Sequence, residues 1–292
     1  MKIGVVGTPG GWSSERLADT IERLTGFRLL VNMDEVRLDL ASGTAWFHET
    51  DLTELDGLII KKIGAWYSPH LLDRLEMLRF LNEQGMPVFS SPLSIMRVLD
   101  RLSCTVTLRT GNIPMPPTTI TEDMDQALIA VEQYGEAVFK PLYSSKARGM
   151  CIIRSGDEAR TQIEAFRSEH PIMYLQQKID LGGRDLGVVF LGGEYMTTYA
   201  RCNTGTSWNT TTVSGGKYAP YQPSRESIDL AYKAQSLFNL DFTCVDVVES
   251  PDGPVVFEVS AFGGFRGILE ACEIDAAERY TRYAMEKISN GK

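Results

Sequence analysis

Residues 242–259 read FTCVDVVESPDGPVVFEV, two apolar runs separated by a short polar turn. The apolar runs predict two β-strands, and Pro-Asp-Gly between them predicts a three-residue hairpin loop with glycine in the left-handed position. That register is centred on Asp252 and sets Asp246 directly opposite Glu258 on one face of the hairpin. A two- or four-residue loop would instead place the two carboxylates on opposite faces.

Two carboxylates that meet within an apolar sheet need a compensating charge, because they would otherwise suffer both desolvation and mutual repulsion. A divalent cation would neutralise both at once. Hard oxygen ligands with room for water and phosphate fit Mg²⁺ in particular, and Mn²⁺ is a second candidate. The competing interpretation is that one of the carboxylates pairs with an arginine such as Arg201 or Arg266.

A second informative segment spans residues 137–150. Residues 137–140 predict an apolar strand that ends in Lys140, and Met150 opens another strand. The loop between them carries Ser144, Lys146 and Arg148, and its backbone N–H groups can form an anion-binding concavity to which the cations add charge. The segment is strand-loop-strand and lacks the GxxxxGK[ST] pattern of a P-loop. A solvated hairpin loop with ordinary surface cations is the alternative interpretation.

The N-terminal 90 residues predict a Rossmann-like α/β unit. An apolar run at 2–6 is followed by a glycine-rich turn and a helical pattern. Further strands are expected at 28–31, 58–60 and 87–90, with a helix at 70–84. The turn reads GTPGG, not GxGxxG, and no clear ribose-binding acid follows a second strand. An NAD-dependent oxidoreductase is therefore the third-ranked hypothesis.

The rest of the chain predicts a mixed α/β and α+β architecture in three parts, 1–92, 93–177 and 178–292. A helix from about 93 leads to a proline-rich stretch at 111–117, which resists helix and sheet. A small unit with two helices and three strands follows. From 178 onward we expect mostly antiparallel sheet, closed by a single helix near 269–288.

Composition excludes several classes of partner. The net charge is −9 and the sequence pI about 5.0, so no basic field exists to gather nucleic acid. The chain begins without a basic and apolar leader and contains no run of 18 apolar residues, which predicts neither signal peptide nor membrane span. Five widely spaced cysteines predict reduced thiols in a cytoplasmic protein, and three scattered histidines disfavour a zinc site.

The order of these features resembles that of ATP-grasp enzymes. A lysine-ended strand, a loop of small residues and a late hairpin with two acids resemble the RimK-like branch, which includes the ribosomal protein S6 glutamate ligase. Ser91-Pro92, Asp100-Arg101, residues 111–114 and the tail at 263–268 add to the likeness. The resemblance implies an ATP-grasp fold with an N-terminal Rossmann-like pre-ATP-grasp domain (1–92), a lid subdomain with its connecting helix (93–177) and a C-terminal sheet subdomain (178–292).

The implied activity is that of an ATP-dependent carboxylate–amine ligase. A carboxylate would attack the γ-phosphate of ATP, and an amine would capture the resulting acyl phosphate to form an amide. The substrates would be small-molecule or peptide amines and carboxylates, and the enzyme would add an amino acid such as glutamate to an amine or peptide substrate. The resemblance implies neither nucleic acid nor membrane partners, and the sequence leaves assembly into a homo-oligomer open.

The resemblance also implies roles for individual residues. Catalysis would fall to Arg201 and Lys140, and the metal ion to Asp246, Glu258 and Ser260. Residues 144–149 would form a lid over the phosphates, and residues 176–179 would line the adenine. The nucleotide would contact Arg101, Lys140, Ser144, Ser145, Lys146, Arg148, Gly149, Gln176, Gln177, Lys178, Ile179 and Asp185.

Several positions depart from the family pattern. Arg101 replaces a lysine, Gln177 a common hinge glutamate, and Gly187 an arginine; Thr211 and Ser260 each replace an asparagine. Arginine keeps the charge of lysine but changes its geometry. These departures motivate the alternative hypothesis of a catalytically degenerate scaffold that binds nucleotide without ligase turnover.

Overall fold

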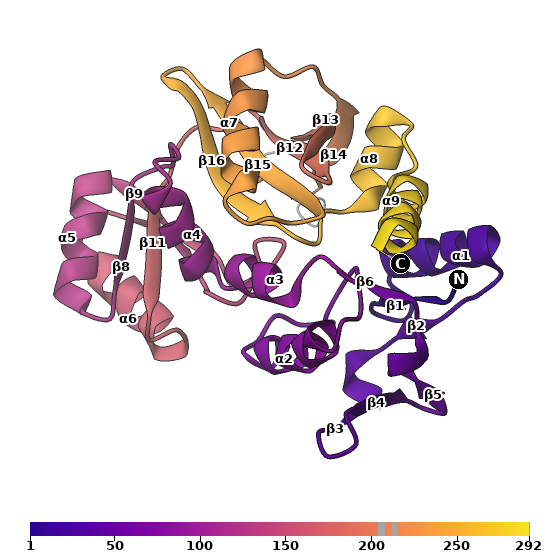
Figure 1. The fold of residues 1–292 in the computed structure, drawn as a ribbon. Helices are drawn as coiled ribbons and strands as arrows, with labels where there is room; N and C mark the ends of the chain where they lie inside the picture. Colours follow the sequence, from indigo (N-terminus) through magenta and orange to yellow (C-terminus); the bar gives the residue numbers. More distant parts are fainter. Residues whose placement is uncertain (204–207, 212–214, 292) are drawn as a thin grey trace.

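The structure, a computed structural model, describes residues 1–203, 208–211 and 215–291. The described residues form four β-sheets, and helices cover the three largest (Figure 1). The expected mixed fold class is confirmed. Throughout the described part of the chain, every helix is too short or too polar to cross a lipid bilayer.

The N-terminal part is built on a parallel sheet in the order β2-β1-β6-β7. Helix α1 packs on one face, and α2 lies on the other. The strands and the second helix match the predicted positions, and the arrangement is consistent with the expected Rossmann-like unit. The elements are β1 (Ile3–Val6), α1 (Trp12–Thr25), β2 (Leu30–Val31), β6 (Gly57–Ile60), α2 (His70–Glu83) and β7 (Val88–Phe89).

A small antiparallel sheet in this part was not predicted. Its strands are only two to four residues long, and two of the three contain no buried residue, so they give a weak periodic signal. The elements are η1 (Met33–Glu35), β3 (Val36–Asp39), β4 (Thr44–Phe47), β5 (Thr50–Asp51) and η2 (Leu52–Glu54).

Two helices, α3 (Pro92–Leu99) and α4 (Arg101–Thr110), join the N-terminal sheet to the next part of the chain. A single helix was expected here, and this detail is wrong. Asp100 has extended backbone angles, φ −80° and ψ 115°, and its side chain accepts a hydrogen bond from the N–H of Leu102. Asp100 therefore ends one helix and caps the next.

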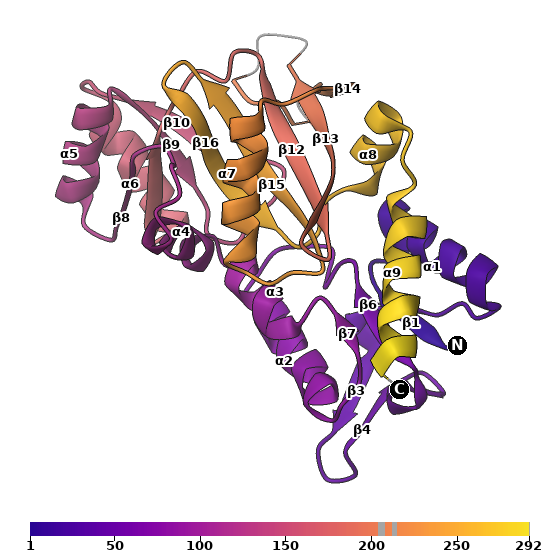
Figure 2. The same cartoon turned by 45° about the horizontal axis from the view of Figure 1, so that its top comes forward.

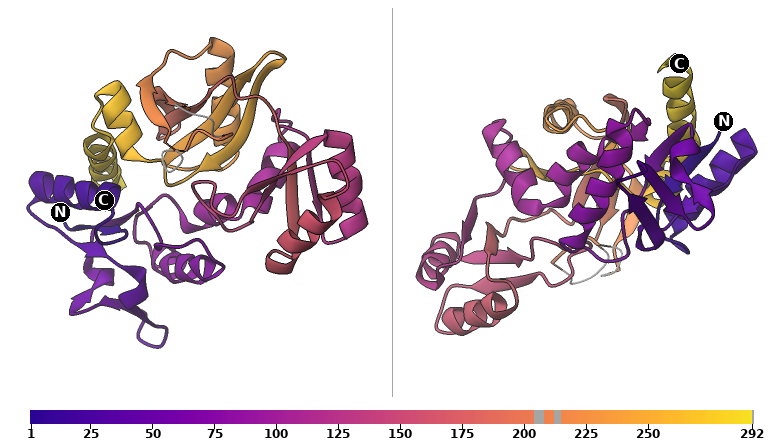
Figure 3. Two further views of the ribbon diagram at one scale, coloured as in Figure 1. Left: turned by 180° about the vertical axis from the view of Figure 1, so that it is seen from behind. Right: turned by 60° about the horizontal axis from the view of Figure 1, so that its bottom comes forward.

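The middle part is an antiparallel sheet in the order β10-β9-β11-β8, with α5 and α6 packed on one face. Side chains alternate along β9: Ala137 and Phe139 face the helices, whereas Val138 and Lys140 face the other way, into a cleft. Figure 3 shows this sheet and the N-terminal sheet on opposite sides of α3 and α4. The elements are β8 (Thr118–Thr121), α5 (Met124–Tyr134), β9 (Glu136–Lys140), β10 (Cys151–Arg154), α6 (Ala159–Glu169) and β11 (Met173–Gln177).

The C-terminal part is the expected antiparallel sheet, in the order β14-β13-β12-β15-β16. Helix α7 was not predicted; it lies across one face (Figure 2) and packs on β15 and β16. The opposite face carries the charged residues of the cleft. The elements are β12 (Arg184–Leu191), β13 (Glu194–Cys202), β14 (Lys217–Pro220), α7 (Arg225–Ser236), β15 (Phe242–Ser250) and β16 (Gly253–Ser260).

The β15–β16 hairpin pairs Asp246 with Glu258 as predicted, but for a different reason. Ser250 pairs with Gly253, so the loop has two residues instead of three. That loop alone would place the two acids on opposite faces. The register shifts between Asp246 and Val247, where Phe257 of β16 is left without a partner. This β-bulge restores the pairing that the sequence predicted with the wrong turn.

The C-terminal helix is two helices, α8 (Phe265–Cys272) and α9 (Ala276–Gly291), where a single helix near 269–288 was expected. Glu273 adopts a left-handed conformation at φ 57°, which ends α8. The Asp275 carboxylate then accepts hydrogen bonds from the N–H groups of Ala277 and Glu278 and so starts α9.

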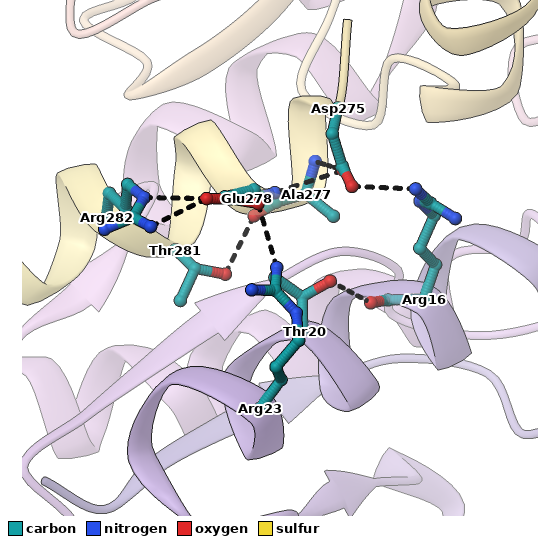
Figure 4. Close-up of polar contacts among 8 residues, drawn as sticks. All are labelled: Arg16, Thr20, Arg23, Asp275, Ala277, Glu278, Thr281 and Arg282. Carbon is teal, nitrogen blue, oxygen red and sulfur yellow. Dashed lines mark hydrogen bonds and ion pairs between the residues drawn. The ribbon is translucent and has the colours of Figure 1, made fainter.

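Helix α9 returns to the N-terminal sheet and lies beside α1, which brings the two ends of the described chain together (Figure 2). Figure 4 shows the ion pairs that join these helices. Arg16 contacts Asp275 at 2.7 Å, and Arg23 contacts Glu278 at 2.9 Å. These partly exposed pairs add little stability, so we attribute the docking of α9 mainly to its apolar face.

The apolar face of α9 gives a testable prediction. Ile288 is 2% exposed and lies against Gly57 of the N-terminal sheet. We expect Ile288→Ala to lower the free energy of unfolding by about 2–4 kcal/mol, because it leaves a cavity in a packed core. Urea denaturation would measure this loss. Ile129→Ala, at a residue 45% exposed on α5, is the control and should lower the free energy of unfolding by under about 1 kcal/mol. Equal losses in the two variants would contradict the packing of Ile288 against the N-terminal sheet.

Candidate functional site

A cleft of about 400 Å³ lies between the middle sheet and the C-terminal sheet. Helices α3 and α4 and the segment that follows β6 complete its walls. Its volume is in the range of small-molecule binding sites. Most of the predicted site residues line it: Arg101, Lys140, Ser144, Ser145, Lys146, Gln176, Gln177, Lys178, Ile179, Asp185, Arg201, Asp246, Glu258 and Ser260.

Two predicted residues lie at the margin of the cleft. The guanidinium of Arg148 stacks 4.9 Å from the ring centroid of Trp66, on the N-terminal part. Gly149 has φ 68° and packs beside Pro141, at the end of the loop. The loop that was predicted to cover phosphates therefore also contacts the N-terminal part of the chain.

The acidic pair has arginines on both sides. Asp246 Oδ1 lies 2.8 Å from Nη2 of Arg201, and Glu258 Oε2 lies 3.3 Å from Nη1 of Arg101. The ion pair between Asp246 and Arg201 confirms the competing interpretation made from the sequence, that an arginine pairs with one of the acids. The divalent cation between the two carboxylates stays a prediction. Arg266 is not involved, since it pairs with Glu270 on α8.

Arg201 is held in place by a buried carboxylate. Asp185 lies directly opposite it on the neighbouring strand, accepts hydrogen bonds from the guanidinium, and accepts another from the hydroxyl of Thr210. Although burial opposes its charge, the carboxylates of Asp185 and Asp246 hold the pKa of Arg201 above its usual value. Burial raises the pKa of the Asp246 carboxyl despite the facing guanidinium. The arrangement keeps a permanent positive charge at this end of the cleft.

Lys140 is a nearly buried cation that lines the cleft. It is 9% exposed, and its ammonium donates a hydrogen bond of 2.6 Å to Oε1 of Gln176. The ammonium also lies 5.1 Å from the ring centroid of Phe257, the residue left unpaired by the bulge. Burial, with Arg101 nearby, lowers the pKa of Lys140 to about 7. A bound anion would favour its charged form.

Arg101 links the loop to the acidic pair. Its Nε donates to the carbonyl of Pro141 at 3.1 Å, and its Nη2 donates to the hydroxyl of Ser144 at 3.3 Å. The same guanidinium contacts Glu258. The fork geometry of arginine allows these three contacts at once, which the compact ammonium of a lysine would not reproduce.

The segment 176–179 forms the edge of the cleft at the end of β11. Gln176 accepts from Lys140 and donates to the hydroxyl of Thr118 at 3.0 Å. Lys178 forms an ion pair with Glu136 at 2.8 Å. These contacts fix the segment and leave the side chains of Gln177 and Ile179 along the cleft.

The position of Gly187 explains one departure from the family pattern. A Cβ atom there would lie 2.6 Å from the ring of Tyr199, so no larger residue fits while that ring keeps its place. Tyr199 itself lines the cleft beside Arg201. Ser260 also lines it, and its hydroxyl accepts a hydrogen bond of 3.2 Å from the N–H of Phe262.

The donor set fits a magnesium nucleotide. Asp246, Glu258 and Ser260 place oxygen atoms on one face of the cleft, and hard oxygen atoms of this kind could hold Mg²⁺. Lys140, Arg101 and Lys146 supply positive charge on the facing walls. Other residues of the cleft were not predicted from the sequence, among them Lys62, Tyr67, Tyr199 and Phe257. For Lys62 the available signal was a lysine pair directly after an apolar strand.

Comparison with known proteins gives concordant matches. Residues 98–284 match the model of the RimK-like ATP-grasp domain. The tetrahydromethanopterin:α-L-glutamate ligase of Methanocaldococcus jannaschii is 26% identical over 80% of both chains. The ligase of the same name from Methanosarcina acetivorans is 24% identical over 99% of both. The ATP-grasp ligase PsnB, solved with a variant precursor, Mg and ADP, superposes with a TM-score of 0.76, 16% identity and 98% coverage of both chains.

Proposed function

Since the chain belongs to the RimK-like ATP-grasp family and is an ATP-dependent carboxylate–amine ligase, we propose that it joins an amino acid such as glutamate to a small-molecule or peptide acceptor. The observation that carries the proposal is the pairing of Asp246 with Glu258 on the cleft face, with Lys140, Arg101 and Arg201 around them. This arrangement can hold a divalent ion and a triphosphate together.

Each residue has a proposed role. Asp246, Glu258 and Ser260 would hold Mg²⁺, which when bound neutralises charge on the phosphates. Lys140 and Arg101, with Ser144, Ser145, Lys146, Arg148 and Gly149 of the loop, would bind the phosphates and exclude water from the acyl phosphate. Residues 176–179 would line the adenine.

Arg201 would bind the transferring phosphoryl group or the substrate carboxylate, because it is the cation closest to Asp246. Asp185 lies in the cleft but is engaged by Arg201 and Thr210. We therefore propose that Asp185 positions Arg201 and influences the nucleotide through it.

The choice of glutamate is supported by the names of the relatives, which are α-L-glutamate ligases. The acceptor class is supported by two kinds of similar protein, since tetrahydromethanopterin is a small molecule and PsnB is complexed with a precursor peptide.

The proposed division at 1–92, 93–177 and 178–292 leaves one main sheet in each part. The five cysteines are free thiols, which accords with a cytoplasmic location.

The test is turnover by the full chain with Mg-ATP, glutamate and pooled small-molecule and peptide acids. We expect release of ADP and phosphate in step with a new amide, detected by mass spectrometry. A parallel reaction with Mn²⁺ would define the metal preference. Tight ATP binding without any product would favour the degenerate scaffold that Ser260 and Gly187 suggest, and NAD binding would favour the oxidoreductase.

A further inference from the structure

Lys62 lines the cleft but has no part in the nucleotide site described above. It follows the carboxyl end of β6, in the parallel N-terminal sheet. In open α/β sheets the crevice beyond the carboxyl ends of the strands is where ligands bind. The N–H groups of Lys61 and Lys62 both donate to the carbonyl of Val6, at 2.8 and 3.1 Å. The backbone that carries Lys62 is thus anchored to the central strand.

The two adjacent lysines have different surroundings. Lys61 is 3% exposed, and its ammonium donates to the carbonyl of Gly263 at 2.5 Å, so its polar group is satisfied within the protein. The ammonium of Lys62 lies 4.5 Å from the ring centroid of Tyr67 and 5.7 Å from that of Phe262. Aromatic faces attract a cation, yet they do not neutralise its charge.

Lys62 is therefore a cation without a counter-charge. Among the other cations of the cleft, Arg101, Lys178 and Arg201 each contact a carboxylate. Lys140 and Lys146 have no such contact in the described ranges, but both are already assigned to the phosphates in the proposed site. Lys62 forms no ion pair with any residue in the described ranges. Burial, together with repulsion from Lys146 and Arg148, lowers its pKa to about 8. At neutral pH the side chain is still mostly protonated. An anion beside it would offset both the cost of burying its charge and the repulsion from Lys146 and Arg148.

We propose that Lys62 binds an anionic group of the acceptor, distinct from the carboxylate that becomes activated, and so selects acceptors with two acidic groups. This inference rests on the proposed ligase function. The nucleotide is a less suitable source of the anion, because Lys140, Arg101 and Lys146 already supply charge from the middle part and α4. Lys62 instead projects from the N-terminal part, beside the segment 262–264.

Titration calorimetry on the full chain can test the proposal without knowledge of the natural acceptor. The probes are N-acetyl-L-glutamate and N-acetyl-L-glutamine, which differ in one carboxylate and have blocked amines. Each is titrated with and without saturating Mg-AMPPNP. We expect the wild-type protein to bind N-acetyl-L-glutamate about tenfold more tightly, the size of one charge-assisted hydrogen bond.

Substitutions of Lys62 test whether its side chain causes the preference for N-acetyl-L-glutamate. Lys62→Gln should abolish the preference, whereas Lys62→Arg should keep most of it. Lys287→Gln is the matched control, since Lys287 also lies over a tyrosine ring, at 5.4 Å from the centroid of Tyr283, but outside the cleft. It should leave the preference unchanged.

Three results would overturn the proposal: equal or undetectable binding of both probes by the wild-type protein, an unchanged preference in Lys62→Gln, or a tenfold loss of Mg-AMPPNP affinity in that variant. The last result would assign Lys62 to the γ-phosphate. The nucleotide titration of the wild-type protein tests the ligase function separately, because failure of Mg-AMPPNP to bind would reject that function whatever the probes show.

Discussion

Replacement of Glu258 by glutamine is expected to reduce Mg²⁺-dependent release of ADP by roughly a hundred- to a thousandfold. Glutamine has the same shape but lacks the negative charge with which we propose that Glu258 holds Mg²⁺. It also leaves Arg101 without its carboxylate partner, so the guanidinium that contacts the loop at Ser144 loses one of its fixed contacts. In the proposed site, both changes would reduce the positive charge and the order around the transferring phosphoryl group.

The fold should tolerate this substitution. The side chain of Glu258 is 44% exposed, so the loss of its ion pair should lower the free energy of unfolding by under about 1 kcal/mol. A coupled assay of ADP release across a range of Mg²⁺ concentrations, with urea denaturation of the same samples, would measure both effects. A deficit that high Mg²⁺ partly restores would identify the metal as the cause.

Glu249→Gln is the matched control, on the same hairpin. The carboxylate of Glu249 accepts hydrogen bonds from Tyr221, Ser224 and Ser227, outside the cleft. Its substitution should affect stability and leave ADP release close to that of the wild-type protein. Normal turnover in Glu258→Gln, or an equal loss in both variants, would reject the metal role of Glu258.

Lys140→Met is expected to lower kcat/KM for ATP by about a hundredfold or more, because it removes a buried cation from the wall of the cleft. Methionine keeps the length and apolar body of the side chain. Mg-ATP binding measured by calorimetry should weaken in parallel. Lys233→Met, on the exposed side of α7, is the control and should bind Mg-ATP as the wild-type protein does.

Although Lys140→Met should lower activity, it should not lower the free energy of unfolding at neutral pH. The folded-state pKa of Lys140 is about 7, below its usual 10.5, so the unfolded chain binds more protons between these values. The stability of the wild-type protein therefore rises with pH across this window. Lys140→Met should be at least as stable at pH 7, by on the order of 1 kcal/mol, and this advantage should shrink toward pH 10.5. A variant that is both unstable and inactive would instead indicate a structural role.

The hairpin at 242–259 shows what sequence patterns can and cannot predict. Apolar alternation located both strands and singled out Asp246 and Glu258 as an acidic pair. The turn was predicted with one residue too many, and the error was cancelled by a bulge at Phe257. Such a bulge depends on how the strand packs against its neighbours, so the local sequence does not reveal it.

The cations around the acidic pair were only partly predictable. Arg201 was expected near the reacting groups, yet its contact with Asp185 depends on the register between β12 and β13. Arg101 and Lys62 reach the cleft from two different parts of the chain. No periodicity within one segment can report a contact with a segment far away.

The sequence by itself determined the type and position of most elements, the lysine at the end of β9 and the two acids of the last hairpin, because these follow from periodicity over a few residues. Only the tertiary structure decided which charges meet, that α9 returns to α1, and that Lys62 faces the cleft. The contact between Arg16 and Asp275 joins residues 259 positions apart. Contacts of that kind arise from packing of whole layers, which is a property of the complete chain.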